Sequence, residues 1–268
     1  MPVMRRVGNR IAGLCSTLGR VVADLILPRV CVVCEMPMPA GATDLACGLC
    51  WGRLPLLPNP QCMRCGHPAA DGSCRWCPLL PSFVRAARSV CWVGGGVGER
   101  MVYALKYEGW RAIGLALGHR MARLPWPVDV LHERTCLIPV PLAASRERER
   151  GFNQSAILCA GMSRVTGLPV WADVVQRARV TSSQTRLTPE QRLTNVAGAF
   201  RIIDRSPSRL HGAHVILVDD VVTTAATLNE CASALWLGGA RIISYVTFGR
   251  ARAAGDRPLS RGRTHHGN

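Results

Sequence analysis

The chain has no uncharged apolar stretch of about 18 residues, which is the length that a membrane-spanning helix requires. Residues 1–10 are basic and residues 11–28 are rich in apolar side chains, which is the general layout of an export signal. Arg20 and Asp24 interrupt this apolar segment, however, and no small-residue cleavage site follows it. We therefore expect no transmembrane segment, no export and a cytoplasmic location.

The apolar residues of this N-terminal segment recur at a helical spacing, and Pro28 ends the pattern. We predict an amphipathic helix within residues 1–29 that packs against the rest of the protein. The alternative is a helix that lies on a membrane surface, because Arg5, Arg6 and Arg10 would favour anionic headgroups. The protein would then sit at the inner face of the membrane.

Lysine, acidic residues and aromatic residues are also scarce. The chain has 33 Lys+Arg against 17 Asp+Glu, a net charge of +16, and its only lysine is Lys106. This balance favours anionic partners such as phosphates or nucleic acid, although an arginine-rich solvated surface would have the same composition. Aromatic residues make up only 5% of the chain, which limits any surface for stacking of bases.

Cysteine, in contrast, is abundant, with 13 residues. Eight of them form four C-x-x-C pairs, namely Cys31/Cys34, Cys47/Cys50, Cys62/Cys65 and Cys74/Cys77. Two residues between thiolates allow a tight turn to direct both sulfurs at one ion, and two such turns complete a closed tetrahedral zinc site. We predict two structural zinc sites from these eight residues. Sequential pairing of the turns is the simplest arrangement, and interleaved pairing is the alternative.

A secreted disulfide scaffold is the competing interpretation of these cysteines. It is disfavoured because the total is odd, and because the five other cysteines lie in apolar segments. Four thiolates leave no coordination position for water, so the predicted zinc ions would replace a hydrophobic core in residues 30–82 and would not act in catalysis. His67, next to the third pair, is expected on the surface, with a role as a spare ligand as the alternative.

From residue 83 the sequence alternates between strand-like and helix-like segments, which predicts an α/β fold with a parallel sheet flanked by helices. The expected strands are residues 89–93, 135–140, 214–218 and 241–248. The expected helices are residues 99–107, 111–124, 154–166 and 226–237, with a further helix start at 188–191. We interpret glycine-rich residues 94–98 as a plain turn, the charged run 145–154 as a solvated loop, and residues 251–268 as a disordered tail.

Residues 214–218 form a continuous apolar run, typical of a central parallel strand, and Asp219 and Asp220 follow it. Residues 221–227 then supply three threonines before a helix. Hydroxyls and backbone N–H groups at a helix start can bind phosphate, and carboxylates can accept hydrogen bonds from ribose hydroxyls. The pattern favours a site for a phosphorylated ribose at the ends of the strands. An Asp-Asp turn before an ordinary capped helix is the alternative.

The segment Val-Ile-Leu-Val-Asp-Asp-Val-Val-Thr-Thr-Ala-Ala-Thr, residues 215–227, resembles the phosphoribosyl pyrophosphate signature of type I phosphoribosyltransferases. The whole chain resembles the ComF family, also called GntX-like, whose members join an N-terminal double zinc ribbon to that domain. Further segments carry the resemblance: the C-x-x-C series, Ala-Leu-Lys-Tyr at 104–107, Pro-Val-Pro-Leu at 139–142, Arg-Gly-Phe-Asn-Gln at 150–154, Gln184, Leu187, Arg192, Asn195 and residues 198–200.

The resemblance implies a double zinc ribbon at residues 30–82, a phosphoribosyltransferase-like domain at 83–250 and roles for individual residues. The candidate catalytic residues are Asp219, Asp220, Lys106 and Arg150. The candidate ligand-binding residues are Asp219, Asp220, Thr223, Thr224, Ala225, Ala226, Thr227 and Tyr107. The aspartates would hold the ribose hydroxyls, residues 223–227 the 5-phosphate, and Lys106 with Tyr107 would lie near the pyrophosphate. Arg146, Arg150 and Asn153 would approach the site, and Mg²⁺ would accompany the pyrophosphate.

Ala225 departs from the family signature, which usually has glycine there. If this residue needs a positive φ, alanine costs on the order of 1 kcal/mol, and its methyl group would hinder close approach of a phosphate to the backbone. We therefore expect a protein that binds phosphoribosyl pyrophosphate and has the family's role in DNA uptake during natural competence, with single-stranded DNA, the membrane or the competence machinery as partners. The alternatives are an active phosphoribosyltransferase and a non-catalytic sensor of this ligand.

Overall fold

The computed structural model describes residues 29–39, 42–68, 74, 76–178, 198–203, 207–252 and 256. Several predictions made from the sequence lie outside these residues. They are the helix of the N-terminal segment, the helix start at 188–191, the matching positions Gln184, Leu187, Arg192 and Asn195, and nearly all of the tail.

Four parallel strands form the main sheet, in the order β1-β6-β5-β2. These strands are β1 (Val84–Val93), β6 (Ile242–Ala251), β5 (His214–Val222) and β2 (Arg134–Pro139). Their residues are mostly buried on both faces, as expected for a parallel sheet covered by helices on both sides. A second, antiparallel pair joins β3 (Val175–Arg177) to β4 (Phe200–Ile202). The predicted α/β class with a parallel sheet is therefore confirmed.

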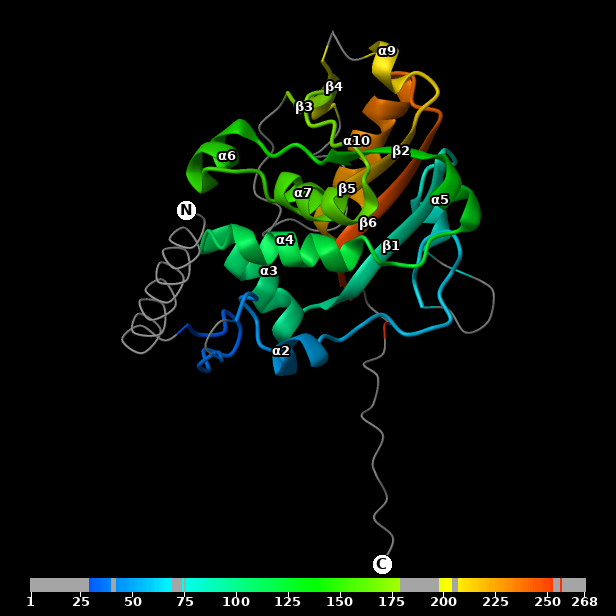
Figure 1. Ribbon diagram of the computed structural model, residues 1–268. Helices are drawn as coiled ribbons and strands as arrows, with labels where there is room; N and C mark the ends of the chain where they lie inside the picture. Colours follow the sequence, from blue (N-terminus) through cyan, green and yellow to red (C-terminus); the bar gives the residue numbers. More distant parts are fainter. Residues whose placement is uncertain are drawn as a thin grey trace, which may run out of the picture.

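Helices cover the two faces of this sheet (Figure 1). One face packs against α3 (Val97–Tyr107), α4 (Arg111–Met121) and α7 (Gln154–Thr166), and the other against α10 (Ala226–Leu237). The shorter helices are α2 (Gly48–Gly52), a 3-10 turn at Cys77–Leu79, α5 (Val128–Glu133), α6 (Ala144–Arg150) and α9 (Pro207–Leu210).

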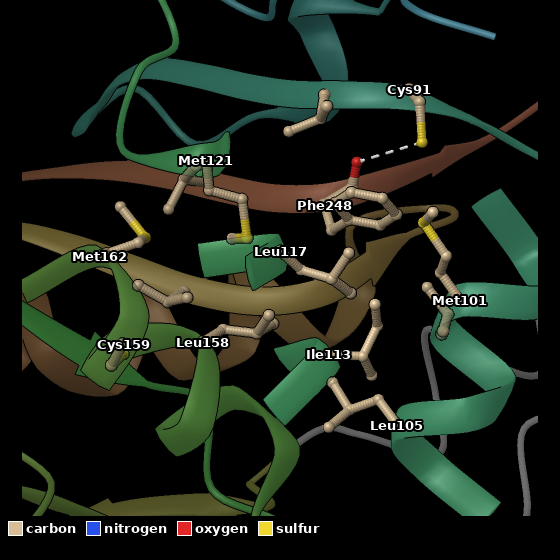
Figure 2. Packing of buried hydrophobic residues seen from close by; sticks show 14 of the residues in the cluster. Cys91, Met101, Leu105, Ile113, Leu117, Met121, Leu158, Cys159, Met162 and Phe248 are labelled. Atoms are coloured by element: carbon tan, nitrogen blue, oxygen red, sulfur yellow. Dashed lines mark hydrogen bonds between the residues drawn. The ribbon is translucent and has the colours of Figure 1, made fainter. Parts of the chain in front are cut away.

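The core under α3, α4 and α7 consists of interlocked aliphatic and sulfur-containing side chains (Figure 2). Met101 and Leu117 are fully buried and point toward Phe248 of β6. Helices α4 and α7 approach so closely that a Cβ atom on Gly161 would lie 2.4 Å from the carbonyl oxygen of Leu115. Glycine is therefore required at this contact, which holds α7 close to the end of β5.

Two predictions about irregular segments were wrong. The charged run that we expected to be a loop contains helix α6, which ends at Gly151 with φ 73°. Arginine and glutamate are good helix formers, and Arg146 and Glu149 form an i,i+3 pair at 3.5 Å. The tail also begins later than expected, because β6 continues through Ala251 and Asp256 contacts His67 at 3.0 Å. Within the described ranges, no helix has the length and apolar character needed to cross a membrane.

Candidate functional site

The eight paired cysteines gather into two separate tetrads, formed by sequential turns. In each tetrad the four sulfur atoms lie within 4.8 Å of one another, and the sets are Cys31, Cys34, Cys47 and Cys50 (the first tetrad) and Cys62, Cys65, Cys74 and Cys77 (the second tetrad). The closest sulfur–sulfur distances are 3.8 Å in the first tetrad and 3.1–3.3 Å in the second. Tetrahedral zinc with Zn–S bonds of about 2.3 Å has sulfur–sulfur edges of about 3.8 Å. The first tetrad matches this spacing, and the second has the same four ligands in a more compact arrangement.

Ionisation of the thiols also fits a cation at the centre of each tetrad. Burial opposes ionisation of Cys31, but backbone hydrogen bonds around Cys34 and Cys47 outweigh it and lower its pKa to about 6. Burial and the neighbouring thiols raise the pKa values of Cys50 and Cys65 far above the ordinary value. Four thiolates so close together cannot all form without a positive ion between them. The tetrads are therefore structural zinc sites, closed by four protein ligands each.

His67 is neither a spare zinc ligand nor a surface residue. Its ring is largely covered, with 12% of the side chain exposed, and Nε2 lies 3.0 Å from Asp256. The ring also packs against Trp76 and Trp92, at centroid distances of 5.2 and 5.7 Å. His67 therefore connects the second tetrad to the end of β6 and to the residues that follow it.

A cleft of about 560 Å³ opens at the C-terminal ends of the parallel strands. Val93 at the end of β1, Val140 after β2 and Ala251 at the end of β6 line it, together with the last residues of β5. This is the position where open α/β sheets bind their ligands. The geometry therefore brings together residues that are more than 100 positions apart in the sequence.

Two carboxylates lie at the floor of the cleft, inside β5 and not after it as the sequence predicted. Asp219 Oδ1 accepts hydrogen bonds from Ser155 Oγ and from the backbone N–H of Asp220, both at 2.9 Å. Burial raises the pKa of Asp219 to about 6, although Lys106 and Ser155 act against this rise. Asp220 is only 3% exposed and lies 2.5 Å from the ammonium group of Lys106.

Cationic side chains gather along one side of the floor. Burial lowers the pKa of Lys106 to about 8, partly offset by the charge of Asp219. Arg146 and Arg150 of α6 also line the cleft, and the Arg150 guanidinium lies 5.1 Å from the ring centre of Tyr107. The sequence therefore identified three cations of the cleft, Lys106, Arg146 and Arg150, although it assigned the two arginines to a loop and the structure places them on a helix.

The threonine loop, residues 223–227, leads from β5 into the N-terminus of α10 and lines the opposite side of the cleft. Ala225 is the N-cap of α10 and has φ 60° and ψ 6°, the left-handed conformation that glycine adopts without strain. Helix α10 has 12 residues, and the first three of them, Ala226, Thr227 and Leu228, line the cleft. This arrangement offers backbone and hydroxyl donors to an anion.

Ala225→Gly should stabilise the protein by about 0.5 kcal/mol, because relief of about 1 kcal/mol of left-handed strain exceeds the added freedom of the unfolded chain. Denaturant unfolding would measure this difference. Ala226→Gly is the matched control, because Ala226 lies in the first turn of α10 and glycine there should cost about 1 kcal/mol. A loss of stability of similar size in both variants would contradict the assignment of strain to Ala225.

Some expectations for the site were incomplete. Asn153 does not line the cleft: it caps α7, where its side chain accepts from the N–H of Ser155 and donates to the carbonyl of Val140 at 3.0 Å. Arg177 of β3 and Glu99 of α3 line the cleft and were not predicted. Arg177 lies in a three-residue strand whose partner in the described part of the chain is β4, so no local pattern could have placed it near Asp219.

Comparisons with known proteins match both parts of the chain. A double zinc ribbon domain matches residues 22–79 and a phosphoribosyl transferase domain matches residues 156–261. The DNA utilization protein YhgH of Escherichia coli (strain K12) is 30% identical over 229 residues, covering 82% of this chain and 96% of that protein. Competence protein F of Haemophilus influenzae is 37% identical over 117 residues, covering 44% of this chain and 50% of that protein.

A solved structure, the glutamine phosphoribosylpyrophosphate amidotransferase of B. subtilis, aligns with 50% of this chain and 25% of its own length. The identity is 19% and the TM-score 0.34, so this similarity adds nothing to the description of the site. The matches to the zinc ribbon, to the phosphoribosyltransferase domain and to nearly the full length of YhgH carry the assignment of the family.

Proposed function

This chain belongs to the ComF family, and we propose that its cleft binds phosphoribosyl pyrophosphate, or a closely related ribose phosphate, as part of a role in DNA uptake during natural competence. The observation that carries the proposal is the composition of one cleft. It is lined by two buried carboxylates, by four cationic side chains, and by a helix N-terminus with three threonines.

Each part of this ligand has suitable groups in the cleft. Vicinal ribose hydroxyls are donors, and Asp219 and Asp220 are acceptors at the floor. The 5-phosphate needs several N–H and O–H donors, which the threonine loop supplies. The pyrophosphate needs positive charge, which Lys106 and Arg150 supply. Magnesium would enter with the pyrophosphate, bound mainly through the oxygens of the ligand.

Lys106 is placed so that it can exchange one anionic partner for another when a ligand binds. Its ammonium group pairs with Asp220 at 2.5 Å, so a buried carboxylate and a buried amine neutralise each other. Pyrophosphate would offer the amine a second, more negative partner, and the released carboxylate could accept from a ribose hydroxyl. The two changes would occur together when ligand binds, which makes Lys106 a positioning group for the anion.

Calorimetric titration of the zinc-loaded protein with phosphoribosyl pyrophosphate and magnesium tests the proposal. We expect a Kd in the micromolar range, and we expect the double variant Asp219→Asn/Asp220→Asn to lose at least a hundredfold in affinity, about 3 kcal/mol, because both acceptors for the ribose are altered. Asp173→Asn, a surface carboxylate paired with Arg209, is the control and should bind as the wild type does. Absence of binding at millimolar ligand by the folded wild type would refute the proposal.

The role in DNA uptake rests on the relatives, whose names refer to DNA utilization and to competence, and on the net charge of +16. A protein that handles single strands should bind an oligonucleotide with an affinity that falls steeply with salt, because each phosphate contact releases counterions. Fluorescence anisotropy of a labelled single strand between 50 and about 200 mM salt measures this slope. An affinity that does not change with salt would contradict this part of the proposal.

A further inference from the structure

Two arginines lie buried between the second tetrad and the main sheet. Arg88 of β1 is 5% exposed and Arg250 of β6 is 9% exposed. Arg250 donates from Nη2 to the carbonyl of Cys65 at 2.6 Å, and Arg88 donates from Nη2 to the carbonyl of Met63 at 3.0 Å. Both carbonyls belong to the turn that begins at Cys62, so the two arginines connect the sheet to one turn of the tetrad.

Buried guanidinium groups need nearby negative charge. In the part of the chain that the structure describes, no carboxylate forms an ion pair with either arginine. The guanidinium groups donate to backbone carbonyls instead: Arg250 to Cys65, and Arg88 to Met63, Ala87 and Pro125. The carboxylate of Asp256 contacts His67 at 3.0 Å.

Zinc bound by four thiolates keeps a net charge of about −2, which matches the two guanidinium charges. We propose that the zinc-loaded second tetrad is the counter-ion of Arg88 and Arg250, and that these arginines are positioning residues that connect the tetrad to the threonine loop. A pocket of about 30 Å³ lies between the arginines and the threonine loop. It is lined by Cys65, by both arginines and by Thr223 and Thr224.

The first tetrad provides an internal comparison. Among the described residues, no arginine side chain donates to the backbone carbonyl of one of its four cysteines. Arg29 donates to the carbonyl of Ala42 at 3.1 Å, and the contact of Arg53 with the carbonyl of Cys50, at 3.2 Å, is made by its backbone N–H. A charge effect of the arginines should therefore appear at the second tetrad and not at the first.

Zinc release from the full-length, zinc-loaded protein to a coloured chelator tests whether the second tetrad is the counter-ion of the arginines. Arg250→Met should release one of the two zinc ions about 10–100-fold faster than the wild type and leave the other unchanged. Arg250→Lys keeps the charge and a donor, and should stay within about threefold of the wild type. The control is Arg85→Met, which lies on β1 like Arg88 but is paired with Asp129. Unchanged release in Arg250→Met, or equal loss in the Met and Lys variants, would overturn the proposal.

A second pair of variants changes the charge of the tetrads and leaves the arginines in place. It tests the proposal even if Arg250→Met does not fold. Cys74→His leaves one less negative charge at the second tetrad, and Cys47→His makes the same change at the first, where no buried arginine depends on it. Both cysteines are partly buried. The melting temperature should fall further in Cys74→His than in Cys47→His, and equal losses would refute the role as counter-ion.

The connection to the threonine loop rests on the proposed function and has a separate readout. With both zinc sites saturated, Arg250→Met should raise the Kd for phosphoribosyl pyrophosphate about threefold or more. The reason is that the arginine no longer fixes the pocket that it lines together with the threonine loop. An unchanged Kd would overturn this half alone. If the wild type itself does not bind, the proposed function fails, whereas the zinc-release result still decides the role of the arginines.

Discussion

Cys50→Ser should lose one of two zinc ions and unfold the first zinc ribbon, whereas Cys159→Ser should keep both. Cys50 is a buried ligand in the first tetrad, and Cys159 is an equally buried cysteine of α7 outside both tetrads. The expected difference is large because metal binding supplies most of the folding free energy of such ribbons, on the order of 10 kcal/mol. Measurement of bound zinc together with limited proteolysis within residues 30–82 would show both effects.

The size of the effect follows from what else holds the ribbon together. In the described part of the first ribbon, residues 29–39 and 42–54, the buried apolar residues besides the ligands are Val32, Ala46 and Leu54. Burial of three such side chains contributes roughly 4–6 kcal/mol, which is less than the entropy lost on ordering the segment. Retention of both zinc ions by Cys50→Ser, or equal zinc loss in Cys159→Ser, would contradict the assignment of the tetrad.

Asp219→Asn should make the protein more stable at neutral pH and at the same time weaken the binding of phosphoribosyl pyrophosphate. The folded pKa of Asp219 is about 6, above the ordinary value of 3.8, because burial disfavours the charged form. Between these two values the folded state holds more protons than the unfolded state, so stability falls as pH rises through this window. Above pH 6 the penalty is complete, and a neutral amide removes it.

The expected gain is about 2–3 kcal/mol at pH 7.5 and falls to roughly 0.5 kcal/mol at pH 4, where the carboxyl is protonated in the folded state and about half protonated in the unfolded state. The asparagine oxygen can still accept from Ser155 and from the N–H of Asp220, so these contacts need not be lost. Urea unfolding of both proteins at the two pH values measures this difference. Asp129→Asn is the control, because Arg85 lowers the pKa of Asp129, so its loss should not stabilise the protein.

A stabilising change that removes binding would identify Asp219 as a group kept for function, at a cost in folding stability. If Asp219→Asn destabilises the protein at pH 7.5, the carboxylate has a structural role instead. If it stabilises the protein but binds the ligand as the wild type does, the ribose hydroxyls are held elsewhere. The two readouts therefore separate the electrostatics of the site from its recognition of the ligand.

Sequence alone determined the parts of this protein whose signals are local. A C-x-x-C turn directs two sulfurs at one point regardless of the rest of the chain, so all eight ligands were identified before the fold was known. The apolar run before Asp219, with threonines and a helix after it, likewise predicted a central parallel strand that leads into an anion-binding loop. Both signals depend on neighbours within a few residues.

Tertiary structure decided the contacts between distant segments. Arg177, Ser155 and Asp219 approach one another only because β3, α7 and β5 meet at one end of the sheet. The run of alternating arginine and glutamate has the charge of a solvated loop and the propensity of a helix, and its place beside the cleft favoured the helix. The burial that raises the pKa of Asp219, and the two arginines behind the second tetrad, exist only when the sheet is assembled, because desolvation is a property of the packed chain and not of its sequence.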